Sequence, residues 1–291
     1  LKGSAAFALG HSLNAPGNPD GLSIQFGYLI DGGLDYISPT KKHEWANSLG
    51  MELQYSKTPV VDALIKSADR IDFRSAYFYH PSKLPWLGPF ISFRLTAPML
   101  PSDAVYADAK EVIRLSPNEE QQFDETTGAL IDSEGNTIDA SHDSVTSYAS
   151  GKRINLTGAF APLTLRQSLG IFAVPVNKPT VKFDARLGFG AWETFVRDGY
   201  NVQDNADTDF LELRQMRDSV QIGPELGMIL SGAAKEIFTY RFSALFMQPV
   251  YQSTDEDLSI KLMNMDFEAG LGVKITKYMS IEYSFKAYKQ P

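Results

Sequence analysis

The residues that most readily suggest chemistry in this 291-residue chain are its four histidines and one neighbouring serine. His11 and Ser12 are adjacent in the segment GHSLN, and a serine activated by a histidine is a common nucleophile. Consecutive side chains of a strand point to opposite faces, so this pair needs a bulge to meet. His43, His80 and His142 have no metal-ligand spacing, and there is no cysteine. We therefore expect no catalytic site, no metal site and no cofactor.

Charged residues offer a second kind of chemistry, because they recur at alternate positions of segments whose other face is apolar. The acids of this set are Asp31, Asp35, Glu52, Asp72, Asp184, Glu225, Asp266, Glu268 and Glu282. The bases are Arg74, Arg94, Arg166, Lys182, Arg186, Arg241 and Lys274, with Lys286 beside them. The two sets nearly balance, so they could pair across an enclosed interior. The interior is then either a charge-lined narrow channel or a structural plug of salt bridges, and both interpretations stay open.

Alternation of apolar and polar residues predicts β-strands through most of the chain. In residues 44–56, for example, Trp45, Leu49 and Leu53 share one face, while Glu52 lies on the other. The same pattern predicts eleven strands, at about 3–12, 22–38, 44–56, 71–80, 87–99, 154–175, 180–191, 219–230, 237–250, 263–276 and 279–287.

The two faces of these strands differ in a way that a soluble sheet does not require. Charged residues almost never enter the apolar face, whereas the opposite face mixes Gly, Ser, Thr and Ala with charges of both signs. Lipid cannot satisfy backbone groups, so a sheet in a bilayer must close and alternate its side chains between lipid and lumen. We therefore predict a transmembrane, antiparallel, up-and-down β-barrel that forms a single domain over residues 1–291.

The links between the predicted strands alternate in length. Short links fall at 39–43, 81–86, 176–180, 232–236 and 275–278, and longer ones at about 13–21, 57–70, 100–152, 201–218 and 251–259. Outer-membrane barrels have short periplasmic turns and longer outer loops. Tyr36, Trp45 and Trp86 lie near the short links, where an interfacial aromatic girdle is expected. Because such barrels have even strand numbers, we expect about twelve strands, with a twelfth following residue 291.

The link at about 100–152 is the longest and is strongly acidic. Its acids include Glu119, Glu120, Asp124, Glu125, Asp132 and Glu134. The stretch TTGALIDSEGNTI predicts a small hairpin that turns at 134–136. A loop of this length is usually functional or disordered, so it could constrict the lumen, bind divalent cations or contact a partner. We expect a solvated acidic cap on the extracellular side, because DSEGN lacks the full calcium-loop spacing.

With these features the chain resembles bacterial outer-membrane β-barrel proteins. The likeness is carried by the alternating strands, the alternation of link lengths and closing hairpins such as residues 265–288, and it matches no single family. The resemblance implies a bacterial outer membrane, contact with its lipids, and other envelope proteins or a second copy as candidate partners. A net charge of −8 argues against nucleic acid as a partner.

The resemblance leaves three functions to compare, because fold alone does not select a function. We expect a porin-like channel for small solutes or ions. The alternative is a non-conducting barrel that anchors or docks to other cell-envelope proteins. The third is a lipid hydrolase, since His11 and Ser12 are similar to the His and Ser of outer-membrane phospholipases. That family's longer asparagine-containing signature is absent here, so we expect no enzyme.

Overall fold

Strands make up the regular structure of the chain, as the alternation predicts. The computed structural model describes residues 2–12, 21–58, 61–115, 122–123, 130–131, 145–204, 210–234, 237–253, 263–275 and 280–289. None of these residues belongs to a helix that is long and apolar enough to cross a membrane.

Most strands belong to one large antiparallel sheet, which contains twelve strands of the described residues. Its order is β1 (Lys2–Ser12), β2 (Gly21–Ile37), β3 (His43–Thr58), β4 (Val61–Tyr79), β5 (Leu87–Ala97), β12 (Leu163–Lys178), β13 (Val181–Phe195), β16 (Ser219–Ala234), β17 (Phe238–Met247), β19 (Asn264–Lys274) and β20 (Ser280–Lys289), with β18 (Tyr251–Gln252) paired to β16. Each of the eleven predicted segments contributes a strand to this path, so the all-β, antiparallel prediction is confirmed.

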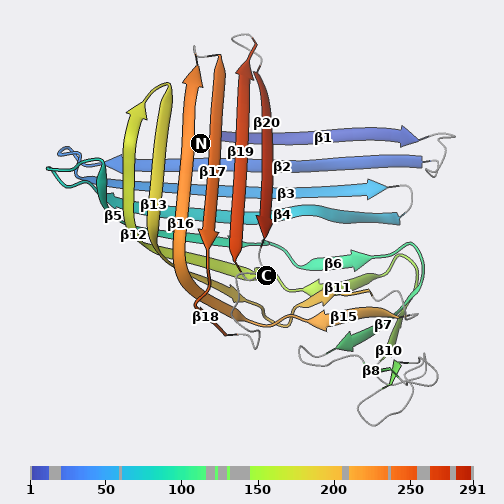
Figure 1. Ribbon diagram of the computed structural model, residues 1–291. Helices are drawn as coiled ribbons and strands as arrows, with labels where there is room; N and C mark the ends of the chain where they lie inside the picture. The colour runs from blue at the N-terminus through green and yellow to red at the C-terminus, as the bar shows by residue number, and fades with distance from the viewer. Residues whose placement is uncertain are drawn as a thin grey trace.

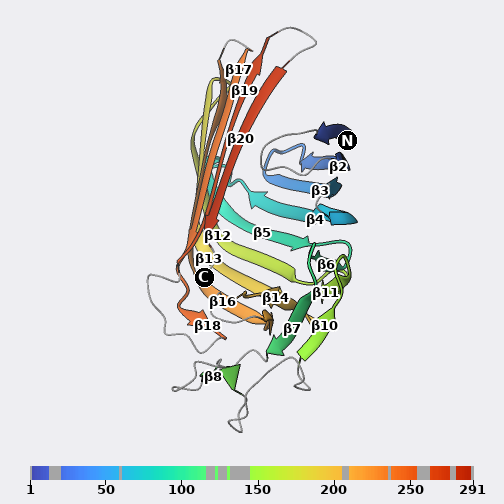
Figure 2. The same ribbon diagram turned by 90° about the vertical axis from the view of Figure 1, so that its right-hand side faces the viewer.

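The large sheet is strongly curled. Figure 1 shows β1–β4 running across the direction of β17–β20, and Figure 2 shows the sheet bending between these two groups through β5, β12 and β13. Within the described residues, β1 pairs only with β2 and β20 only with β19. The sheet is therefore a half-barrel with a concave and a convex face, and the predicted closure is not part of it.

One end of the large sheet carries the short links that the sequence predicts. They connect the strands across residues 38–42, 80–86, 179–180, 235–237 and 275–279. At the other end the predicted long link at 57–70 is wrong, because β3 continues to Thr58 and β4 begins at Val61. The pairing of these strands shifts register after Gln54 and after Ser56. Such bulges interrupt a strict two-residue alternation, which is why the pattern hid the extra strand length.

The predicted strand at 154–175 is in fact two strands. β11 (Arg153–Thr157) pairs with β6 (Ser102–Val105), whereas β12 begins at Leu163 and belongs to the large sheet. Between them Phe160 has a φ of 58°, and the Ala161–Pro162 bond is cis. A non-glycine residue with positive φ marks a tight turn, so the chain changes sheets here.

The predicted long links at about 100–152 and 201–218 are not loops throughout, because both contribute strands to a second, small sheet. This small sheet has the order β10 (Val145–Tyr148), β7 (Lys110–Leu115), β15 (Leu211–Gln215) and β14 (Tyr200–Val202), and β7 and β15 are parallel. Val112, Ile154, Leu211 and Leu213 form its almost completely buried core, so β11 packs against it as well. Figure 1 shows this small sheet beyond the long-link end of the large sheet.

Part of the acidic segment forms a further short hairpin. β8 (Gln122–Phe123) pairs antiparallel with β9 (Leu130–Ile131). The hairpin turn predicted at 134–136 lies outside the described residues.

The convex face of the large sheet presents the predicted apolar register. One row of directly paired residues joins Tyr77, Ile91, Leu169 and Phe189 across four strands. Leu169 and Phe189 are 64% and 61% exposed. A parallel row joins Ile171, Leu187 and Leu226, all of them exposed. Exposed apolar areas that extend over many strands mark contact with a partner or a membrane.

Candidate functional site

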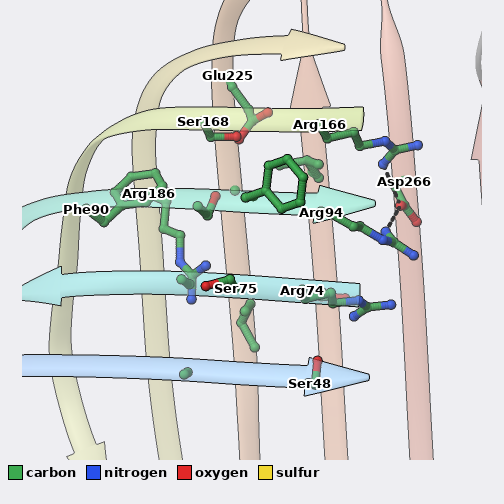
Figure 3. Close-up of a pocket in the computed structure, with 18 of the residues that line it drawn as sticks. Ser48, Arg74, Ser75, Phe90, Arg94, Arg166, Ser168, Arg186, Glu225 and Asp266 are labelled. Carbon is green, nitrogen blue, oxygen red and sulfur yellow. Dashed lines mark hydrogen bonds and ion pairs between the residues drawn. The ribbon is translucent and has the colours of Figure 1, made fainter. Parts of the chain in front are cut away.

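The concave face holds a cavity of about 580 Å³, which we take as the candidate site. Strands β2, β3, β4, β5, β12, β13, β16, β17 and β19 supply its walls. The charged residues that line it are Asp35, Arg74, Arg94, Arg166, Arg186, Glu225, Arg241, Asp266 and Glu268, all of them predicted from the alternation. Figure 3 shows several of these side chains extending from neighbouring strands into the same space.

Asp72 holds two arginines from adjacent strands. Its carboxylate accepts hydrogen bonds from Arg74 Nε and Nη2 at 2.9 and 3.1 Å, and from Arg94 Nε at 3.2 Å and Arg94 Nη2. Both arginines therefore present the same fork to one acid, an arrangement that fixes the planes of both guanidinium groups. The Asp72 side chain is almost buried by this contact, while Arg74 stays half-exposed to the interior.

Asp266 connects opposite parts of the curled sheet. It comes from β19, and its Oδ2 lies 3.2 Å from Arg166 Nη1 and 3.6 Å from Arg94 Nη1. Strands β13, β16 and β17 separate β19 from β12 in the sheet order, so these ion pairs cross the interior and do not run along the wall. Figure 3 shows Asp266 facing Arg94 and Arg166.

Trp192 and Ser168 complete the site, and both escaped the sequence prediction. Trp192 stacks against the Arg166 guanidinium, whose Cζ lies 3.7 Å from the ring centroid. Glu225 accepts hydrogen bonds from Ser168 Oγ at 2.8 Å and from Trp192 Nε1 at 3.4 Å. Trp192 continues the inward register of β13 by one step beyond the predicted strand end at 191, which is the signal that could have identified it.

A buried aromatic cluster at the short-link end was also missed. Phe78, Phe90 and Phe172 pack together on the inward face. The rings of Phe78 and Phe172 meet edge to face, with their centroids 5.2 Å apart. The Cζ atom of Arg186 lies 4.8 Å from the ring centroid of Phe78, and its Nε forms an ion pair with Asp184 Oδ1 at 3.0 Å. The sequence signal was weak, because aromatic residues are common on either face of a strand.

The other predicted interior residues are spread over further hollows. Asp31, Glu52, Asp72 and Lys286 line a second cavity of about 460 Å³. Lys182 and Asp184 line a third, of about 380 Å³. Lys274 is exposed and lines none of these three cavities, and the side chain of Glu282 lies outside the described residues.

Of the four histidines, His43 and His80 have described side chains, and neither lines this cavity. Glu119, Glu120, Asp124, Glu125, Asp132 and Glu134 lie outside the described residues, as do the side chains of His11 and Ser12. His43 contacts the Tyr77 hydroxyl at 2.6 Å, and His80 contacts Glu44 at 3.2 Å. In the described part of the chain no three His, Asp or Glu side chains are grouped so that they could hold a metal ion.

No protein-family model matches the chain, and no curated protein matches it either. The candidate site itself offers fixed guanidinium groups, shared carboxylates and a cavity on the concave face.

Proposed function

We propose that the curled sheet is part of a closed β-barrel in a bacterial outer membrane and acts as a porin-like channel for small solutes or ions. The observation that carries the proposal is the distribution of side chains over the two faces. Large apolar residues are exposed on the convex face, whereas the predicted charges gather around cavities on the concave face. Lipid outside and water inside explain both preferences at once.

Aromatic residues near the short links support the same placement. Tyr36, Trp45 and Trp86 are all exposed at this end of the large sheet. Ring systems with one polar edge favour the boundary between hydrocarbon and headgroups. In our proposal this end therefore lies at one membrane surface, and the small sheet lies beyond the opposite surface.

Strand direction is compatible with closure of the barrel by one further strand. Neighbouring strands along the eleven-strand path are antiparallel, so β1 and β20 both run from the short-link end of the sheet toward the long-link end. One further strand running the opposite way would pair with both edges and bring the path to the even number usual for such barrels. Barrels close because an unpaired edge in lipid leaves backbone groups without partners.

A second candidate function is favoured by the contacts that cross the interior. The ion pairs of Asp266 with Arg94 and Arg166, together with the cluster of Phe78, Phe90 and Phe172, occupy space that a wide pore needs. A narrowed barrel of this kind would anchor or dock other envelope proteins, and the small sheet offers a surface for them.

Conductance separates the two candidates. The purified protein, refolded in detergent and added to a planar lipid bilayer, is expected to give steady single-channel current steps. Asp266→Asn removes the ion pairs that cross the interior and should enlarge those steps. The matched control is Asp103→Asn, because Asp103 pairs with Arg153 near the small sheet and lines none of the three cavities. Silent bilayers with stable capture of an envelope protein would favour the anchor. A chain that stays monodisperse in plain buffer would contradict the membrane placement altogether.

A further inference from the structure

Three arginines of adjacent strands form one directly paired row on the concave face. Arg74 of β4 pairs in register with Arg94 of β5, and Arg94 pairs with Arg166 of β12. Like charges in directly opposed positions of a sheet are destabilising. A row of three such residues therefore needs neighbouring acids or a bound anion to offset the repulsion between the guanidinium groups.

The arginine row (Arg74, Arg94 and Arg166) has fewer direct ion-pair partners than it has guanidinium groups. Among the described side chains, Asp72 and Asp266 are the two acids that form ion pairs with it. Glu225 and Glu268, which line the same cavity, have other partners. Glu225 accepts hydrogen bonds from the neutral donors Ser168 and Trp192, and Glu268 pairs with Lys286 at 3.1 Å. Three guanidinium groups thus share two carboxylates through direct ion pairs, while Glu225 and Glu268 act on Arg166 and Arg74 only at longer range across the cavity.

The guanidinium groups of the row are also held in a fixed geometry, and some of their N–H groups remain available to a ligand. Arg74 and Arg94 both give Nε and Nη2 to Asp72, and the plane of Arg166 rests on Trp192. No hydrogen bond from Arg74 Nη1 is formed within the described residues, and Arg94 Nη1 approaches Asp266 only to 3.6 Å. Figure 3 shows the three side chains extending toward the same side of the interior. Ordered guanidinium groups suit the planar recognition of an oxyanion.

We propose that the arginine row binds the carboxylate or phosphate group of a small anionic solute. The cavity of about 580 Å³ beside the row has the size of a small-molecule site. This inference rests on the proposed channel function, because it names the class of solute that the channel admits. Chloride, which lacks a planar or tetrahedral set of acceptor oxygens, does not reproduce the contact.

The stacking of Trp192 on Arg166 provides a direct optical test. The chain has three tryptophans, so replacing Trp45 and Trp86 by Phe leaves Trp192 as the sole reporter. The detergent-folded protein is titrated with inorganic phosphate, with succinate and with sodium chloride at constant ionic strength. We expect a saturable change in Trp192 emission with at least one of the two oxyanions and none with chloride. The active oxyanion identifies the group that is bound. An equal response to all three salts would overturn the proposal.

Variants of the row make the test specific. Arg74→Gln should weaken oxyanion binding about tenfold or more, because it removes charge-assisted hydrogen bonds. Arg74→Lys keeps the charge but loses the fork, so it should weaken binding less. Both are compared by circular dichroism, and if Arg74→Gln fails to fold, Arg74→Lys carries the test. Arg197→Gln is the matched control, since Arg197 is exposed between β13 and β14 and lines none of the three cavities. Equal losses in Arg74→Gln and Arg197→Gln would refute a specific site.

The binding test and the conductance test fail independently. Current steps without saturable oxyanion binding would reject the inference and leave the channel in place. Saturable binding in a protein that gives no current would support the oxyanion site and reject the channel.

Discussion

The small sheet and the large sheet expose opposite kinds of side chain. In the small sheet Leu213 is 0% exposed, and it packs with Val112, Ile154 and Leu211 as in any water-soluble core. In the large sheet Leu187 is 55% exposed on the convex face, while Asp72 is buried on the concave face. One chain therefore buries leucine in one region and turns it outward in the other.

This contrast shows that the outward apolar face of the large sheet is not a consequence of composition. The chain builds an ordinary hydrophobic core where the small sheet needs one, so the large sheet follows a different requirement. Burial of apolar area stabilises by about 25 cal/mol per Å² only when that area leaves water. The exposed rows on the convex face gain this stabilisation only if lipid or a partner covers them.

Leu213→Ala tests the small sheet and should have the largest effect. Removing a fully buried leucine side chain should destabilise the small sheet by about 2–5 kcal/mol, because a cavity remains. Hydrogen–deuterium exchange of β7 and β15 measures the change, and it should be the same in detergent and in lipid vesicles. Leu187→Ala is the control. Because Leu187 is exposed, this substitution should lower the free energy of unfolding by less than about 1 kcal/mol in detergent. Equal losses in both variants would erase the contrast between the two regions.

Leu49→Arg tests the convex face and should have the next largest effect. Leu49 is exposed near the middle of β3, so an arginine there should cost about 2–4 kcal/mol when the protein is folded into a bilayer. Urea unfolding from lipid vesicles measures the loss. Ser48→Asp places a charge one residue away, on the interior face and directly opposite Arg74, and should be tolerated. If both variants were tolerated equally, lipid would not contact the convex face.

Asp72→Asn tests the concave face and should have the smallest effect of the three. The change leaves Arg74 and Arg94 without their shared acid and should cost about 1–3 kcal/mol, measured by the same unfolding experiment. Glu52→Gln is the control, because the Glu52–Arg70 pair is 3.6 Å long and partly exposed. An exposed pair contributes less than about 1 kcal/mol. If Glu52→Gln lowered the free energy of unfolding as much as Asp72→Asn, the interior acids would act only through net charge.

Much of the large sheet could be predicted because strand alternation is local. The inward placement of Arg94 and Arg166 follows from counting by two along β5 and β12, and their direct opposition follows only from register. The prediction failed where the backbone departs from regular pairing, as at the register shifts near Gln54 and at the turn around Phe160. The small sheet could not be predicted from local alternation, because β7 and β15 are parallel neighbours about a hundred residues apart in the chain.

The sequence by itself determined which residues share a face, since successive side chains of a strand must point in opposite directions. It also determined where the short links fall. Only the tertiary structure decided which charges meet, because Asp266 reaches Arg94 and Arg166 through the curvature of the whole sheet. The curvature of a sheet is the sum of small twists between many neighbouring strands. The two-residue alternation within each strand does not reveal how large that total curvature is.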